Sequence, residues 1–300
     1  IFLKATKEVI QDQVECGIDI VTDGEVRREN YIHYHCRHLA GIDFNQLTKK
    51  VARTGNYECY LPTIVSKVEA KDSFLVNEWL AAQKLSSKPV KVTLPGPMTI
   101  TDTIANDYYT SNNQLGNDLA YAINAEIKRL VEAGCKYIQV DEPLFARKPH
   151  EAIDYGILNL EKCFDGIENA NVEKITHICC GYPDKLDAVD YPKAPLNSYH
   201  KIAKILDDSI LDTISIEDAH RYNDLNLLEK FKKTKIILGL IKIASSVEET
   251  INEIQMRVDQ ALNHIDPNQL IAAPDCGLGH LPRNLAKKKL KKMVEAVKKY

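Results

Sequence analysis

Short apolar runs rich in Ile and Val alternate with amphipathic helical stretches along most of the chain. Runs with the length and composition of buried strands are Ile18–Thr22, Val90–Leu94, Tyr137–Val140, Ile175–Cys179, Thr213–Ile216, Ile236–Leu240 and Leu270–Ala273. Strands that alternate with helices form βαβ units, so this order predicts a parallel sheet. Seven such strands, with a helix ahead of the first, are one short of a (β/α)8 barrel. We therefore predict a single α/β barrel domain over residues 1–300, with its first strand before Ile1.

The stretches between these runs have helical periodicity. Apolar residues from Leu115 to Val131 recur on one helical face. A second helix is expected over Val247–Leu262, with a capping box formed by Ser245 and Glu248. The last helix is expected from about Leu285, and we interpret its lysines as a solvated outer face rather than a nucleic-acid contact.

The alternation is interrupted between Arg27 and about Ser73. A connection of this length after a barrel strand usually serves function. We expect the long β-to-α connection over residues 27–73 to form a lid or a wall of a substrate pocket. Within it, Tyr57–Val68 is expected to supply a short hairpin.

The composition excludes several classes of protein. A hydrophobic fraction of 44% allows a full core, and a net charge of −3 does not favour binding to nucleic acid. The chain has no apolar run of about 18 residues and no signal-peptide pattern, so we expect a cytoplasmic protein without a membrane segment. Eight irregularly spaced cysteines do not resemble a secreted disulfide framework, which favours buried, catalytic or metal-bound thiols.

Residues that commonly bind zinc lie at the ends of three predicted strands. They are His177 and Cys179, then Glu217, then Cys276. The carboxyl ends of parallel barrel strands face one mouth, and the strand period places His177 and Cys179 on the same face. Two thiolates, an imidazole and a carboxylate make a tetrahedral set for Zn²⁺. Such an electron-rich site favours activation of a substrate thiol over activation of water.

Carboxylates follow two other predicted strands. Asp23 and Glu25 come after the first strand, and Asp141 and Glu142 come after the third. At the mouth, Glu25 and Asp141 are candidates to hold the ammonium group of an amino-acid substrate. The alternative is that Asp23 or Asp141 caps a helix or pairs with an arginine at position 27 or 28.

Other histidines are weaker candidates. His33, His35, Cys36 and His38 fall within six positions, but they lie in the long connection and lack a second ligand pair, so we interpret them as ordinary loop residues. His280 follows the last thiol closely enough to reach the mouth. It is a candidate acid or a partner that orients a ligand, as are Glu142 and Asp23.

In this order, these segments resemble the C-terminal catalytic barrel of cobalamin-independent methionine synthase. The matching segments are GIDIVTDGEVRREN, KPVKVTLPGPMTI, LVEAGCKYIQVDEPLFAR, THICCGYP, DTISIED and APDCGLG. The resemblance implies a TIM barrel in which His177, Cys179, Glu217 and Cys276 bind zinc. It also implies that Glu25 and Asp141 hold the amino group of homocysteine.

The sequence departs from that family in features that concern the methyl donor. The family's catalytic histidine follows its seventh barrel strand, which corresponds to Ile236–Leu240, where this chain has GLIKIASSVEE. The tryptophan expected after the family's third barrel strand, which corresponds to Val90–Leu94, is absent from TITDTIANDYY. The family's N-terminal domain is not in this sequence, and its first-strand Gly-Ser segment would precede Ile1. The chain therefore looks more like short, single-barrel relatives, with a methylcorrinoid protein or methyltetrahydrofolate as the donor.

The resemblance predicts a zinc-dependent S-methyltransferase of methionine biosynthesis. The nucleophile is expected to be the zinc-bound thiolate of homocysteine, with no protein side chain acting as a nucleophile. One alternative is a zinc methyltransferase for another thiol such as coenzyme M, although an anionic sulfonate would need cationic partners instead of Glu25 and Asp141. The other alternative is a non-catalytic barrel that binds zinc or a thiol.

Overall fold

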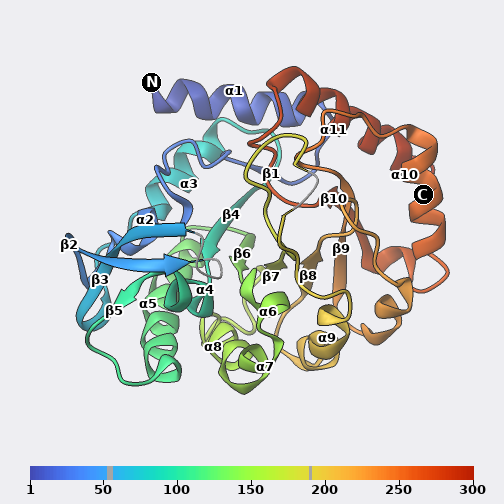
Figure 1. Cartoon of the computed structure of the whole chain (residues 1–300). Helices are drawn as coiled ribbons and strands as arrows, with labels where there is room; N and C mark the ends of the chain where they lie inside the picture. Colours follow the sequence, from blue (N-terminus) through green and yellow to red (C-terminus); the bar gives the residue numbers. More distant parts are fainter. Residues whose placement is uncertain (53–56, 189–190) are drawn as a thin grey trace.

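Seven parallel strands form one curled sheet that follows the order of the chain (Figure 1). The computed structural model describes residues 1–52, 57–188 and 191–300. The sheet has the order β1-β4-β6-β7-β8-β9-β10, and each pair of neighbours is parallel. The strands are β1 Val21–Thr22, β4 Val90–Pro95, β6 Tyr137–Asp141, β7 Glu173–Ile178, β8 Thr213–Ile216, β9 Lys235–Ile241 and β10 Leu270–Pro274. The predicted α/β architecture is confirmed, whereas the eighth strand and closure of the barrel stay predictions.

Strand alternation separates an apolar outer face from a polar inner face. In β4, Val90, Val92 and Leu94 are buried against the helices. Lys91 points to the other face, where its Nζ donates to Oε1 of Gln139 in β6 at 2.5 Å. Polar contacts between neighbouring strands therefore fill the concave side of the sheet.

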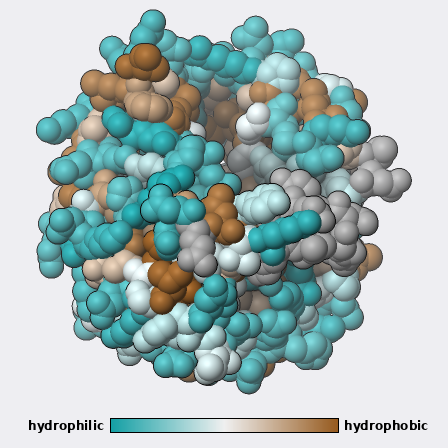
Figure 2. Space-filling model, turned by 60° about the vertical axis from the view of Figure 1, so that its left-hand side comes forward, coloured by the Kyte–Doolittle hydropathy of each residue, from teal (hydrophilic) through white to brown (hydrophobic). Residues whose placement is uncertain are grey.

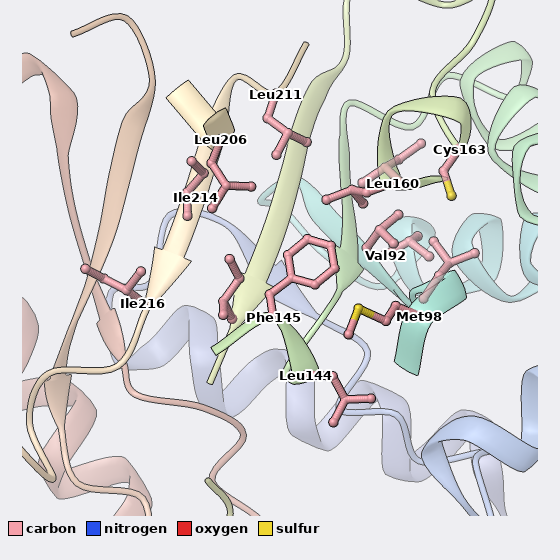
Figure 3. Close-up of a cluster of buried hydrophobic side chains, with 14 of the residues drawn as sticks. Val92, Met98, Leu144, Phe145, Leu160, Cys163, Leu206, Leu211, Ile214 and Ile216 are labelled. Atoms are coloured by element: carbon pink, nitrogen blue, oxygen red, sulfur yellow. The ribbon is translucent and has the colours of Figure 1, made fainter. Parts of the chain in front are cut away.

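Helices cover the outer face of the sheet (Figure 1). The longer ones are α1 Phe2–Glu15, α3 Leu75–Lys84, α5 Asn112–Glu132, α9 Ser198–Asp208, α10 Ile251–Ala261 and α11 Arg283–Val297. Shorter elements are α2 Tyr31–Cys36, α4 Pro97–Thr103, α6 Leu144–Arg147, α7 Pro149–Glu151, a π-helix over Ala152–Gly156, α8 Ile157–Lys162, and 3₁₀ turns at Leu225–Lys230 and Pro267–Gln269. Figure 3 shows how Phe145 and Met98 pack with apolar side chains of the strands and helices in the core.

The long connection after β1 contains an antiparallel hairpin. It passes through α2 into β2 Leu39–Ala52 and returns as β3 Tyr57–Ala70, which pairs with β5 Ala105–Asn106. The expectation of a short hairpin within Tyr57–Val68 was wrong, because that stretch is one strand of a longer hairpin whose residues 53–56 lie outside the described part. The role of the connection as a lid or wall stays a prediction.

Two details of the predicted helices were wrong. The helix α10 begins at Ile251 and is capped by Thr250 with Glu253, instead of starting near Val247 with Ser245 and Glu248. Lys289 of α11 does not belong to a solvated face. It is fully buried, and its Nζ lies 3.2 Å from a carboxylate oxygen of Glu249. No helix in the described ranges is long and apolar enough to cross a membrane.

Ion pairs join the first and last helices. Oδ2 of Asp12 accepts a hydrogen bond from Nε of Arg283 at 2.5 Å, and Oδ1 accepts from Nζ of Lys287 at 2.6 Å. The hydrogen bond from Arg283 lowers the pKa of Asp12, and Lys287 lowers it further against the opposing effect of burial. A carboxylate with a depressed pKa in the folded state stabilises the fold above its unfolded pKa and loses this effect as the pH falls.

We therefore expect Asp12→Asn to lower the thermal unfolding midpoint at neutral pH by about 1–2 °C. The difference from the unmodified protein should shrink as the pH falls through the lowered pKa of Asp12, and it should disappear once Asp12 is protonated in both the folded and the unfolded state. Thermal melts monitored by circular dichroism across this pH range measure the effect. Asp19→Asn is the matched control, because the Asp19 side chain is 87% exposed. A difference that persists in acid would mean that Asp12 acts through packing.

Candidate active site

The structure brings His177, Cys179 and Cys276 together at the carboxyl end of the sheet. His177 lies in β7, Cys179 directly follows this strand, and Cys276 follows β10. The Cys276 thiol lies beside both the Cys179 thiol and the His177 ring. The hydrogen bond from Cys179 and the charge of His177 lower the pKa of Cys276, whereas the contact with Cys276 raises the pKa of Cys179. These three side chains, the thiol cluster, are therefore joined through their contacts with Cys276, which shift their pKa values.

The imidazole of His177 is fixed with one nitrogen turned toward the cluster. Its Nδ1 forms a hydrogen bond of 2.9 Å with Oγ of Ser215 in β8. Its Nε2 is buried and has no hydrogen-bond partner among the described residues. Burial lowers the pKa of His177, but Cys276 and the nearby carboxylates raise it to about 9. A buried ring nitrogen beside two thiols is suited to bind a metal or to carry a proton.

Glu217 lies directly after β8 and completes the predicted set. Its Oε2 accepts a hydrogen bond from the backbone N–H of Cys180 at 3.0 Å. Burial raises its pKa to about 8, assisted by the charge of Asp275. The carboxylate is thus held close to the thiol cluster in a site where a negative charge is costly without a cation.

Asp275 fixes the turn that follows Glu217. The Oδ1 atom of Asp275 accepts from the N–H groups of Asp218 and Ala219, both at 2.8 Å. Its Oδ2 accepts from the N–H of His220 at 2.7 Å and contacts Nδ1 of the same residue at 2.8 Å. Because Asp275 directly precedes Cys276, this fully buried carboxylate links the segments that carry Glu217 and Cys276.

The donor set fits zinc by its chemistry. One ring nitrogen, two sulfurs and a carboxylate oxygen are ligands that zinc prefers, and the buried Nε2 of His177 would gain the partner it lacks. Within residues 1–52, 57–188 and 191–300, no group of three or more His, Cys, Asp or Glu side chains has the arrangement of a formed metal site. The carboxylate of Glu217 is bonded to the backbone instead.

Glu25 and Asp141 lie beside this cluster, after β1 and at the end of β6. Oε1 of Glu25 accepts from Nη1 of Arg28 at 2.8 Å and from Oγ1 of Thr93 at 2.6 Å. Asp141 is 8% exposed, and burial together with the charge of Glu25 raises its pKa to about 6 against the opposing effect of His177. A buried carboxylate beside a second carboxylate can receive a cationic group.

Asp23 and Glu142 have structural contacts. Oδ1 of Asp23 accepts from the N–H of Glu25 at 2.9 Å and so shapes the turn after β1. Glu142 is fully buried, and its two oxygens accept from the N–H groups of Met98 and Thr99 at 2.9 Å each. Glu142 thereby caps the first turn of α4. Such a capping role was considered from the sequence for its neighbour Asp141.

His280 helps to fix a connection that lies beside the thiol cluster. Its Nε2 forms a hydrogen bond of 2.9 Å with the carbonyl oxygen of Pro183, and its ring lies 4.9 Å from that of Tyr182. Burial raises the pKa of Tyr182 to about 12, and the charges of Cys276 and Cys179 contribute. His280 thus supports an aromatic side chain at the cluster, and its role as an acid stays a prediction.

A cavity lies elsewhere in the molecule, away from the thiol cluster and the two candidate carboxylates. Its volume is about 330 Å³, and it lies between β2, α4, β5 and α7. Lys148 and Asp102 line it and form an ion pair of 2.5 Å. None of the predicted site residues lines this cavity.

Figure 2 shows a molecular face with mainly hydrophilic residues and small separate hydrophobic groups.

Comparison with known proteins identifies the family of this chain. Residues 2–299 match the sequence model of the cobalamin-independent synthase catalytic domain. The chain belongs to the cobalamin-independent methionine synthase family. It is 33% identical to the methionine synthase of Saccharolobus solfataricus over 99% of this chain and 83% of that protein. The Sulfurisphaera tokodaii methionine synthase is also 33% identical, over 99% of this chain and 81% of the relative.

A solved structure of the same family supports the fold. The B12-independent methionine synthase from Shewanella sp. W3-18-1, in complex with selenomethionine, superposes with a TM-score of 0.88 and 31% identity. The alignment covers 98% of this chain and 86% of that chain. The family is one of methyltransferases, so the structural and sequence relatives agree on an enzyme of methyl transfer.

The connection from β9 to α10 contains no histidine. This connection is bonded to the one after β7. The N–H of Asp187 donates to the carbonyl oxygen of Ala244 at 2.8 Å, and Oδ1 of Asp187 accepts from the N–H of Ser246 at 2.7 Å. Two hydrogen bonds therefore join the described parts of the two connections.

The expectation of ordinary loop residues was wrong for His33, His35 and Cys36, which lie in α2, whereas His38 follows the helix. The three histidines pack with aromatic side chains. The ring of His38 stacks on Phe74 at 4.1 Å, and His35 is buried with its Nδ1 3.0 Å from the carbonyl oxygen of Tyr31. His33 contacts Phe44 edge to face. The contacts of these histidines are therefore packing contacts with neighbouring aromatic rings.

Several contacts of the site were not predicted. Arg28 was considered as a partner of Asp23 or Asp141 but holds Glu25 instead. The contacts of Tyr31 with Asp141, of Ser215 with His177 and of Asp275 with the turn after Glu217 were not considered. Ser215 is two positions before Glu217, so the strand period places both side chains on the same face of the sheet. This spacing could have indicated that Ser215 points toward the site. The partners of Tyr31 and Asp275 lie far away in the sequence, so no local pattern indicates them.

Proposed function

We propose that the chain transfers a methyl group to the thiol of homocysteine and produces methionine. The observation that carries the proposal is the thiol cluster beside Glu217, with the carboxylate pair Glu25 and Asp141 nearby. A cluster that can hold a soft metal suits the thiol end of homocysteine, and the carboxylates suit its amino end. The Shewanella relative in complex with selenomethionine supports a ligand of this class.

We propose that Zn²⁺ is held by Nε2 of His177, the thiolates of Cys179 and Cys276, and the carboxylate of Glu217. Zinc bound there would lower the pKa of a substrate thiol and so supply a thiolate at neutral pH. Ser215 keeps the His177 ring oriented, and the N–H of Cys180 holds Glu217 near the cluster. No protein side chain needs to act as the nucleophile, because the substrate provides its own sulfur.

The remaining residues bind the substrate and hold it in place. Glu25 and Asp141 would accept the ammonium group, which fixes the sulfur of homocysteine relative to the thiol cluster. We propose that the connections after β7 and β9, which are hydrogen-bonded to each other, limit the access of water on one side. The thiolate sulfur of homocysteine then attacks the methyl group of the donor and forms the S–C bond of methionine. The bond between the methyl group and the donor breaks, and its electron pair stays on the donor.

We propose a methylcorrinoid, carried by a partner protein, or methyltetrahydrofolate as the donor. The missing tryptophan after β4 and the missing histidine after β9 favour the methylcorrinoid. In the family that the sequence resembles, the presence of this tryptophan and this histidine accompanies folate use. A protein localised in the cytoplasm would meet either donor.

The proposal predicts methionine formation that depends on both homocysteine and zinc. Purified protein should contain one zinc per chain with two sulfur ligands by zinc-edge X-ray absorption, rising to three when homocysteine is added. Methionine should be detected by mass spectrometry with methylcobalamin or methyltetrahydrofolate as the donor. Absence of zinc, or an unchanged sulfur count, would contradict the proposed thiol activation. Thiol binding without methionine formation from any donor would favour a non-catalytic barrel.

A further inference from the structure

One short segment of the chain contacts both candidate carboxylates. Glu25, Arg28 and Tyr31 are spaced three residues apart and lead from the turn after β1 into the first turn of α2. Asn30 caps this helix, because its side chain accepts from the N–H groups of Ile32 and His33 at 2.9 Å each. The cap fixes where the helix starts and therefore the position of Tyr31.

Asp141 receives one donor on each oxygen. The hydroxyl of Tyr31 donates to Oδ2 at 2.9 Å, and Nε2 of Gln139 donates to Oδ1 at 2.6 Å. Lys91 determines the orientation of the Gln139 amide, because an ammonium can only donate and its Nζ contacts Oε1. Burial and the adjacent Asp141 raise the pKa of Tyr31, so its phenol stays protonated and donating. Asp141 is therefore held as an acceptor.

Glu25 is held from one side. Arg28, whose side chain is 3% exposed, donates to Oε1 of Glu25 and also to the carbonyl oxygen of Thr93 at 2.9 Å. Glu25 has a positive φ of 54°, a conformation that costs a non-glycine residue energy and often accompanies function. Across the described ranges, Oε2 of Glu25 has no recorded donor. This oxygen remains able to accept from a ligand.

We propose that Tyr31 is a positioning residue that makes the site selective for thiols carrying an α-amino group. The Tyr31 hydroxyl fixes the carboxylate of Asp141, so that Asp141 and the second oxygen of Glu25 accept one ammonium group together. Arg28 and Thr93 fix the carboxylate of Glu25 in the same way, through hydrogen bonds to its Oε1. The inference rests on the proposed function and deepens it, because it identifies how the amino group is selected.

The test compares ligands with and without the amino group. Methionine and 4-(methylthio)butyrate differ only in this group, and their binding to the zinc-loaded protein can be measured by calorimetry without any methyl donor. Tyr31→Phe should weaken methionine binding about tenfold or more, because a hydrogen bond to a charged group is lost. Binding of 4-(methylthio)butyrate should be unchanged within about twofold. In turnover with homocysteine, the loss should lie mainly in KM.

Tyr34→Phe is the matched control. Tyr34 lies on the same helix, and its hydroxyl donates to the carboxylate of Glu78 instead. We expect this variant to bind both ligands like the unmodified protein. Equal losses for both ligands in Tyr31→Phe would show a merely structural role and overturn the inference. Methionine binding without turnover would leave the inference standing and contradict only the proposed reaction, whereas no methionine binding would overturn both.

Discussion

Cys276→Ser is expected to abolish metal retention and methyl transfer together. Cys276 contacts both Cys179 and His177, so its thiol is the centre of the cluster. A serine hydroxyl is a poor ligand for zinc and does not replace the thiolate. Since the loss of a residue that only supports a ligand typically costs 10–100-fold, we expect the loss of this ligand to exceed about 100-fold in activity. Zinc analysis after dialysis and an assay of methionine formation measure the two effects.

Cys180→Ser is the matched control for this variant. Cys180 is also buried and lies next to Cys179, but its position alternates to the other face of the chain. Its backbone N–H, which holds Glu217, is retained in the variant. We expect zinc content and activity close to those of the unmodified protein. A Cys276→Ser variant that is fully active without metal would contradict the mechanism.

Gly239→Ala is expected to damage the site without touching a proposed ligand. A Cβ atom at Gly239 would lie 1.9 Å from Oδ1 of Asp275, so the carboxylate would have to leave the turn after Glu217. Overpacking of this kind costs about 1–3 kcal/mol in the free energy of unfolding. Displacement of Asp275 would also break its hydrogen bonds with the backbone N–H groups of the turn after Glu217. We expect a lower denaturation midpoint in urea and weaker zinc retention at temperatures where the variant is folded.

Gly279→Ala separates this effect from a general intolerance of alanine. No atom lies within 4 Å of a Cβ built at Gly279. Its stability and zinc content should match those of the unmodified protein. If Gly239→Ala instead kept the full zinc affinity while folded, Asp275 would not be required to position Glu217 and Cys276.

The strands and their order could be predicted because each is a short β-branched run between helices. The predicted Thr213–Ile216 agrees with β8 in both bounds, and the other inner strands agree within a few residues. A hairpin was expected, but its first strand was missed because register shifts between Ala40 and Ile42 and between Asp43 and Leu47 disturb the alternation that indicates a strand. The start of α10 was missed because Asp187, from another connection, takes the N–H of Ser246.

The candidate site could be predicted to a similar extent. His177, Cys179 and Cys276 come together because the ends of parallel strands share one edge of the sheet, a rule that needs only the strand order. The contacts of Tyr31 with Asp141, and of Asp275 with the turn after Glu217, depend on side-chain directions in the folded chain. Such directions have no signal in the local sequence.

A metal bound by the thiol cluster, as proposed, would couple metal binding to folding. The members of the cluster come from β7 and from beyond β10, so the cluster does not exist until the strands between residues 173 and 274 have assembled in order. A cation that binds the assembled cluster, but not the unfolded chain, shifts the equilibrium toward the folded state by mass action. The protein would then resist unfolding most in the half of the sheet that carries its proposed chemistry. Metal supply would set its lifetime as well as its activity.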